Sequence, residues 1–106
     1  MARPLINVPK SARRGEVIEI KTLIAHVMET GFRHDASGRL VPRDIINRLV
    51  VTYSGDVIFT ADLFPAIAAN PFVAFTTVAT ENGDITFRWT DDQGAVTTET
   101  VGITVT

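Results

Sequence analysis

The chain has 106 residues, the length of one domain, and we expect that domain to span residues 1–106. Its 45% hydrophobic and 21% charged content predicts a folded chain, and a net charge of -2 without a basic stripe argues against nucleic-acid binding. No apolar run reaches the roughly 18 residues of a membrane span, so we expect no membrane insertion. The absence of cysteine excludes disulfides, thiolate nucleophiles and cysteine-bound metals.

Apolar residues recur along the chain with a period of two, which is typical of strands. In chain order, the pattern predicts strands over residues 16–26, 48–53, 57–61, 72–80, 84–89 and 96–105. These short segments, separated by turns, predict an all-β fold, an immunoglobulin-like β-sandwich of about seven strands. A compact barrel is the alternative architecture, and helix should be minimal.

The connections between the strands carry signals of their own. Residues 53–56 predict a tight hairpin, whereas 63–70 contain Pro65 and predict a crossover between sheets, with room for a helical turn at 66–69. The Asn82-Gly83 pair is the strongest hairpin signal in the chain. Glycines at predicted turns are expected to supply positive φ angles: Gly15, Gly31, Gly38, Gly55, Gly83 and Gly94.

The aromatic residues divide into core and surface candidates. Phe87 and Trp89 alternate with polar residues and should face inward together with Ile85. Phe64 and Phe72 flank the predicted crossover, and they are candidates for a partner interface because loops carry function more often than strands.

Residues 23–31, Leu-Ile-Ala-His-Val-Met-Glu-Thr-Gly, are the most informative part of the chain. They place a titratable ring, a thioether, a carboxylate and a hydroxyl within five residues at a predicted strand end. Such a segment is open to three interpretations: a small active site, a docking edge, or an elaborate strand terminus.

A metal site is one form the active-site interpretation can take. His26 and His34 lie on either side of Gly31, with Glu29 and Asp35 nearby, so a zinc or copper site is conceivable. The spacing matches no metal motif, however, and a hydrogen-bonded His26 with an exposed His34 is the simpler hypothesis. The serines lie in predicted turns or the N-terminal loop without a nucleophile elbow, so we expect neither enzyme activity nor a cofactor.

Residues spread over nearly the whole chain carry a family resemblance. The most specific are His-x-Met-Glu-Thr-Gly at 26–31 and Asn-Pro-Phe at 70–72. On these motifs the chain resembles the SoxZ family, the cysteine-free subunits of the SoxYZ carrier in bacterial sulfur oxidation. Val27 stands where the family often has proline, which would leave this strand end less rigid. The other matching positions are Lys10, Gly15, Glu16, 20–24, Arg33, Asp35, Gly38, Pro42, 53–55, Phe75, Trp89, Thr90, Asp91 and Gly94.

The resemblance implies a scaffold subunit of bacterial thiosulfate oxidation. It implies an obligate heterodimer with SoxY, whose cysteine, on a flexible C-terminal Gly-Gly-Cys-Gly-Gly arm, carries the sulfur intermediate covalently. Other Sox enzymes such as SoxB, SoxAX and SoxCD would act through that carrier. The N-terminus has no apolar run typical of a signal peptide, which taken alone points to the cytoplasm. The resemblance instead implies a periplasmic subunit that is exported together with SoxY, whose own signal directs export.

Two segments are the candidates for contact with this partner, the strand end at 26–31 and the end of the crossover at 70–72. Two other functions stay open on the residues alone: a free-standing β-sandwich binding module, and a small His-based metal-binding domain. The candidate contact residues are His26, Met28, Glu29, Thr30, Gly31, Asn70, Pro71 and Phe72.

Overall fold

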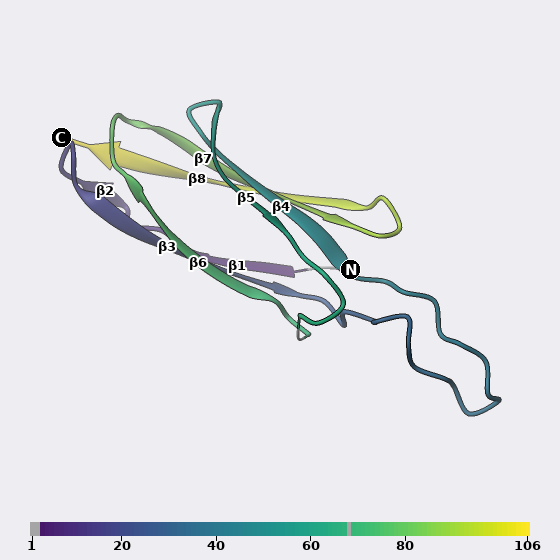
Figure 1. The fold of residues 1–106 in the computed structure, drawn as a ribbon. Coiled ribbons are helices and arrows are strands. Elements are labelled where there is room, and N and C mark those ends of the chain that lie inside the picture. Colours follow the sequence, from purple (N-terminus) through teal and green to yellow (C-terminus); the bar gives the residue numbers. More distant parts are fainter. Residues whose placement is uncertain (1–2, 68) are drawn as a thin grey trace.

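The computed structural model describes residues 3–67 and 69–106, which form eight strands and no helix. A three-stranded sheet has the order β1-β3-β6 and a five-stranded sheet the order β2-β8-β7-β4-β5 (Figure 1). The predicted all-β sandwich is therefore confirmed, with eight strands in place of about seven. The strands are β1 (Arg3–Asn7), β2 (Ser11–Ala12), β3 (Val17–Ala25), β4 (Ile46–Tyr53), β5 (Asp56–Asp62), β6 (Phe72–Val78), β7 (Gly83–Asp91) and β8 (Val96–Val105).

The core lies between the two sheets, where the alternating apolar residues meet. Ile20 on β3 and Leu49 on β4 are fully buried, as are Ile85 and Phe87 on β7, and Trp89 is nearly so. The predicted inward face of 84–89 is confirmed. Within the described part of the chain, no helix is long and apolar enough to cross a membrane.

Two N-terminal strands were not predicted from the sequence. β1 pairs antiparallel with β3, with Leu5 opposite Leu23, and β2 adds two residues in parallel to β8. Pro4 lies in β1, and proline within a strand is confined to sheet edges, which is where β1 lies. The apolar run of β1 is short, which gives little local signal for a strand.

The predicted hairpin at Asn82-Gly83 is wrong. β6 belongs to the three-stranded sheet and β7 to the five-stranded sheet, so the chain crosses between sheets at residues 79–82. Gly83 does not have a positive φ, although the other five predicted turn glycines do. A Cβ at position 83 would lie 2.0 Å from the Ser54 Oγ, so glycine there lets the two segments approach closely without displacing the Ser54 hydroxyl.

The Tyr53 hydroxyl holds this crossing in place. It accepts hydrogen bonds from the amides of Thr80 (3.3 Å) and Glu81 (3.2 Å) and donates one to the Glu81 carbonyl oxygen. These tertiary contacts override the local preference of the Asn-Gly pair. Replacing Tyr53 by Phe is expected to lower the free energy of unfolding by about 1–3 kcal/mol, because the crossing loses these partners.

Urea denaturation measures this loss. Thr86→Val is the matched control, because its hydroxyl lies within hydrogen-bond distance of another exposed hydroxyl, that of Thr100 (3.1 Å). The control should change stability by less than about 0.5 kcal/mol. Equal effects of the two variants would mean that the Tyr53 hydroxyl does not hold the crossing.

The crossover at residues 63–71 connects the two sheets as predicted, from β5 to β6. Its described part includes a turn in which the Ile67 amide donates to the Phe64 carbonyl oxygen at 3.0 Å. The helical turn predicted for 66–69 includes Ala68, which lies outside the described residues, and the described neighbours are not helical.

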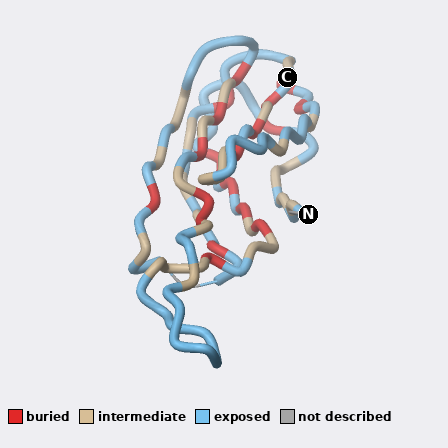
Figure 2. Tube along the Cα trace, turned by 90° about the vertical axis from the view of Figure 1, so that its right-hand side faces the viewer, coloured by how far each residue is buried: buried red, intermediate tan, exposed pale blue. Residues whose placement is uncertain are grey.

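A long arm leaves the sandwich between β3 and β4 and projects beyond one end (Figure 1). Its two sides are joined by isolated bridges between Glu29 and Asp44 and between His34 and Leu40. Residues 32–40 are all exposed, and Figure 2 shows the arm at the bottom of the view, away from the buried residues. The arm gives the molecule its length of 59 Å against a cross-section of 19 × 18 Å.

Candidate functional site

The structure brings the two candidate contact segments together at the root of the arm. The His26 amide donates to the Asn70 Oδ1 at 2.9 Å, and the Asn70 amide donates back to the His26 carbonyl oxygen at 2.8 Å. The Ile24 amide donates to the Pro71 carbonyl oxygen at 3.2 Å. The end of β3 and the end of the crossover thus form one unit, although they are more than 40 residues apart in sequence.

The members of this unit differ in exposure. Met28 is only 4% exposed and Pro71 is buried, so both support the strand end from inside. The Met28 backbone has a φ of 53°, and its sulfur accepts a hydrogen bond from the Ile46 amide at 3.2 Å. Phe72, by contrast, is 59% exposed and begins β6 at the surface.

Glu29, Thr30 and Gly31 shape the start of the arm. The Glu29 carboxylate pairs with the Arg33 guanidinium at 2.7 Å, and this hydrogen bond lowers the pKa of Glu29. The Thr30 hydroxyl accepts from the Phe32 amide at 3.1 Å. Gly31 has a φ of 87°, and a Cβ there would lie 3.0 Å from the Cβ of Arg43 on the opposite side of the arm.

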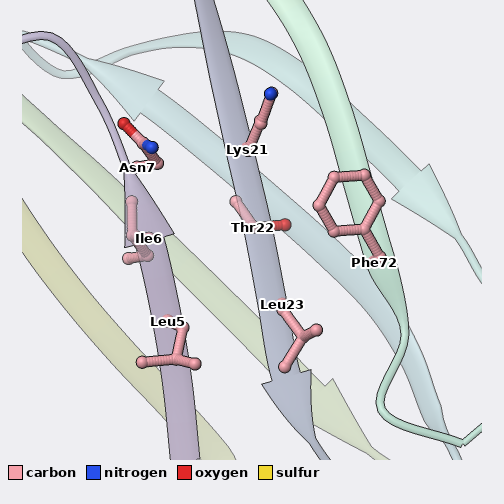
Figure 3. Close-up of a pocket in the computed structure, with 7 residues that line it drawn as sticks. All are labelled: Leu5, Ile6, Asn7, Lys21, Thr22, Leu23 and Phe72. Atoms are coloured by element: carbon pink, nitrogen blue, oxygen red, sulfur yellow. The ribbon is translucent and has the colours of Figure 1, made fainter.

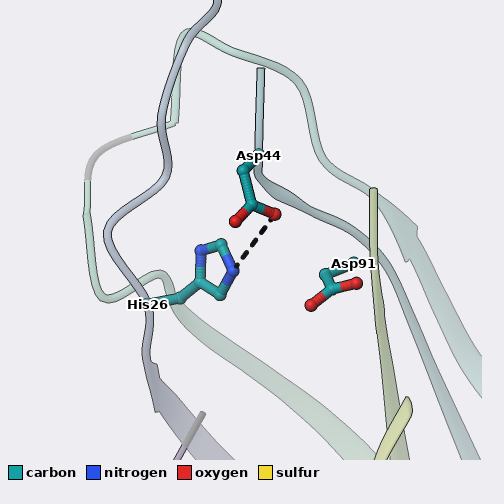
Figure 4. Close-up of side chains that lie close together, drawn as sticks. All are labelled: His26, Asp44 and Asp91. Atoms are coloured by element: carbon teal, nitrogen blue, oxygen red, sulfur yellow. Dashed lines mark ion pairs between the residues drawn. The ribbon is translucent and has the colours of Figure 1, made fainter. Parts of the chain in front are cut away.

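A small polar cluster lies beside the unit. His26 directly follows β3, Asp44 lies in the arm, and Asp91 ends β7. One ligand atom of each of the three lies within 4.8 Å of the others (Figure 4). The His26 Nε2 is 3.9 Å from the Asp44 Oδ1, a buried oxygen without a hydrogen-bond partner. A hollow of about 360 Å³ opens here, lined by Ala25, His26, Val27, Asp44 and Asn70.

The hydrogen bonding of His26 bears on what this cluster can do. The Met28 amide donates to the His26 Nδ1 at 3.1 Å, so in the neutral ring the proton is on Nε2 and faces the Asp44 carboxylate. A neutral histidine that binds a metal through Nε2 needs the proton on Nδ1, where the amide already donates. The cluster therefore fits a histidine–carboxylate pair better than a metal centre.

The metal site considered from the sequence is not assembled. His34 lies along the arm and bridges Leu40, and Glu29 is paired with Arg33, so neither joins His26. Asp35 instead caps the tip, where its Oδ1 accepts from the Ser37 amide, the Ser37 hydroxyl and the Arg39 amide at 2.7–3.0 Å. These bonds, led by that from Ser37, lower the pKa of Asp35.

Asp92 fastens the other side of the arm to the sandwich. Its carboxylate accepts from the Arg43 Nε (2.7 Å) and Nη2 (2.9 Å), from the Asn47 Nδ2 (3.0 Å) and from the Ile45 amide (3.2 Å). The Arg43 hydrogen bond is the main cause that holds the pKa of Asp92 below its usual value. Asp92→Asn is expected to cost about 2–3 kcal/mol of stability at pH 7.

The stabilisation by the Asp92 carboxylate depends on pH in a defined direction. Because the folded-state pKa of Asp92 is lowered, its stabilisation is present above the unfolded-state value of about 3.9 and is lost as the pH falls through the folded-state value. The stability gap between wild type and Asp92→Asn should therefore close in acid. Asp62→Asn, which breaks an exposed pair with Arg48, is the control and should cost less than about 1 kcal/mol. A gap that stays constant down to pH 2 contradicts the assignment.

The outer face of the three-stranded sheet carries a row of large apolar side chains, of which the outer two are exposed and the middle one, Leu23, is half-buried. Leu5 on β1 is opposite Leu23 on β3, which in turn is opposite Phe72 on β6, so the three side chains lie in register across the sheet (Figure 3). Leu5 is 69% exposed. The row lines a groove of about 290 Å³ at the arm end of the sheet. We call Leu5, Leu23 and Phe72 the apolar row.

The outer face of the five-stranded sheet is different. Its central positions pair threonines across strands, with Thr52 opposite Thr86 and Thr86 opposite Thr100. An Arg48–Asp62 ion pair at 3.0 Å lies on the same face. The exposed apolar residues of this face, Val57 and Val96, lie apart from each other on β5 and β8. The three-stranded sheet instead gathers large apolar side chains side by side, as a docking face does.

The sequence indicated only one member of the apolar row. Phe72 is a candidate because it flanks the crossover. Leu23 lies in a predicted strand, but its neighbours across the sheet could not be predicted because β1, which carries Leu5, was not recognised as a strand. The alternation of Leu5 and Asn7 with Pro4 and Ile6 was the available signal, and a partner strand was needed to place it on the sheet.

Comparison with solved structures shows how widely this fold occurs. The superoxide reductase (neelaredoxin) of Ignicoccus hospitalis superposes with a TM-score of 0.71 at 15% identity, covering 97% of this chain and 80% of that one. A putative superoxide reductase of Thermotoga maritima gives 0.72 at 15% identity, covering 97% and 85%. The sulfur carrier protein SoxY of Chlorobium limicola f thiosulfatophilum gives 0.68 at 11% identity, covering 97% and 78%. At these identities the likeness is one of fold.

No curated protein sequence matches the chain. The family model described as "Sulphur oxidation protein SoxZ" matches residues 6–102, nearly the full length and all the motifs discussed above. The chain therefore belongs to the SoxZ family of sulphur oxidation proteins and has a role in Sox sulfur oxidation.

Proposed function

We propose that this chain is the scaffold subunit of a SoxYZ sulfur-carrier complex. It would hold a SoxY-type chain whose C-terminal cysteine carries the sulfur intermediate, and help present that cargo to Sox enzymes such as SoxB, SoxAX and SoxCD. The observation that carries the proposal is the apolar row, three large side chains in register on the outer face of one sheet, of which Leu5 and Phe72 are mainly exposed.

The composition supports two subunits with different roles, one that carries the sulfur and one that does not. Covalent carriage of sulfane sulfur needs a thiolate, and the chain has no cysteine. A partner must therefore supply the thiol. A scaffold without thiols also cannot exchange with the bound sulfur, which keeps the cargo on one residue.

The proposal predicts that an adjacent reading frame encodes a SoxY-type protein ending near Gly-Gly-Cys-Gly-Gly. The test is to co-express the chain with that protein. A one-to-one complex is expected by size exclusion with light scattering. Leu23→Asp, which places a charge in the middle of the apolar row, should weaken pairing by about 30-fold or more. Thr98→Asp, on the exposed outer face of the five-stranded sheet, is the matched control and should leave pairing unchanged.

A wild-type chain that stays a monomer beside this partner overturns the proposal and favours a free-standing binding module. Stoichiometric zinc or copper in the purified protein would favour the metal-binding alternative instead.

We also propose a periplasmic location, reached by export together with the SoxY-type partner. Fractionation of cells tests it. The chain should appear in the periplasm only when the partner carries its signal peptide, and it should stay in the cytoplasm when that signal is deleted. Export in the absence of the partner contradicts co-export.

A further inference from the structure

The outer part of the arm, residues 32–40, contributes no side chain to the core of the sandwich. Along its length, Phe32 is 76% exposed and Leu40 is 58% exposed, on opposite sides of the arm. Neither belongs to the core cluster or to the residues packed against it. Large apolar side chains exposed this far from a core are unfavourable in water when the chain is alone. They become stabilising only when another surface covers them.

The arm is nevertheless ordered by specific contacts. At its root, Glu29 and Asp44 exchange two backbone hydrogen bonds of 2.8 and 2.9 Å, and Arg43 is clamped by Asp92. Toward the tip, Arg33 pairs with Glu29, and Asp35 accepts three hydrogen bonds that close the turn. An arm that already has its shape loses less conformational entropy on binding than a disordered loop does.

The arm is long enough to reach along the side of a domain of this fold. From Glu29 to the tip near Ser37 is roughly eight residues, which span at most about 26 Å when fully extended. The molecule itself is 19 × 18 Å across. The SoxY of Chlorobium limicola shares this fold, so an arm of this reach spans the width of a partner of the SoxY type.

The apolar row lies at the end of the sheet from which the arm leaves. Leu23 is two residues before the end of β3, and Phe72 begins β6 directly after the segment bonded to His26. A stable interface covers about 800 Å² on each partner, and one fully buried aromatic supplies about 150–250 Å² of it. The three side chains of the row fall short of that area, and the arm is the continuous neighbouring surface that extends it.

We propose that residues 29–44 form a clasp that lies along the SoxY-type partner and buries Phe32 and Leu40 against it. This inference rests on the proposed function and adds to it a second contact, separate from the apolar row. The partner is thereby held between a sheet face and a preorganised arm. The clasp leaves the far end of the sandwich, including the start of β5, free.

The experiment measures the affinity of the purified chain for the SoxY-type partner by titration calorimetry. Phe32→Ser and Leu40→Ser are each expected to weaken binding by about 10-fold, and the double variant by about 100-fold, with unchanged thermal unfolding. Val57→Ser is the matched control, because Val57 is 61% exposed on β5 and its loss should change affinity by less than twofold. Hydrogen exchange of residues 31–41 should slow when the partner binds.

The outcomes separate the two proposals. If the double arm variant binds like wild type while Leu23→Asp does not, the clasp is wrong and the scaffold function stands. If wild type does not bind the partner at all, the scaffold function fails and the clasp fails with it. If the arm variants abolish self-association and leave partner binding intact, the arm binds a second copy of this chain and the clasp is overturned.

Discussion

Truncating Phe87 to alanine is expected to lower the free energy of unfolding by about 3–5 kcal/mol. Phe87 is fully buried on β7, lies opposite Val51 of β4, and has its ring 5.9 Å from that of Trp89. Its removal leaves a cavity between two sheets whose neighbouring strands cannot collapse inward without breaking their pairing. Urea denaturation at pH 7 measures the loss.

Phe72→Ala is the matched comparison for this prediction. The same atoms are removed from a strand aromatic, but Phe72 is 59% exposed, so stability should change by less than about 1 kcal/mol. Its effect should appear instead in pairing, which is expected to weaken by about 30-fold. A Phe72→Ala protein that unfolds as readily as Phe87→Ala would show that the outer face of the sheet is not free.

Met28→Ala is expected to cost about 3–5 kcal/mol as well, although Met28 lies outside every strand. Two losses add: the packing of a side chain that is 4% exposed, and the acceptor of the Ile46 amide at the start of β4. That amide would be left buried without a partner. Thermal and urea unfolding measure the effect.

Met28→Leu separates these two losses, because it keeps the volume and removes only the sulfur. It should cost about 1–2 kcal/mol. Hydrogen exchange adds a local measurement, since the amides of Glu29 and Asp44 at the arm root should exchange faster in Met28→Ala than in wild type. Unchanged exchange there would mean that Met28 stabilises the core without holding the arm.

The alternation of residues was enough to predict the sandwich and much of its core. Ile18, Ile20 and Ile24 face inward as their spacing predicts, and so do Ile85, Phe87 and Trp89. A period of two with one apolar set can be satisfied only by a sheet with one buried face, so this part of the fold is encoded locally.

Local signals failed where the outcome depends on distant segments. The Asn82-Gly83 pair is a good hairpin sequence, yet the Tyr53 hydroxyl and the pairing of β6 with β3 direct the chain across to the other sheet. β1 became a strand because the edge of β3 was available to it. Neither competition can be judged from the residues of the segment alone.

The candidate site shows the same division. The motif at 26–31 identified the family, and the lack of cysteine excluded a thiol role for this chain, because both are properties of the residues themselves. Only the tertiary structure joined His26 to Asn70, buried Met28 and aligned Leu5, Leu23 and Phe72 in one row. The physical reason is that side-chain identity is local, whereas burial and register depend on which strands pair and which sheet covers them.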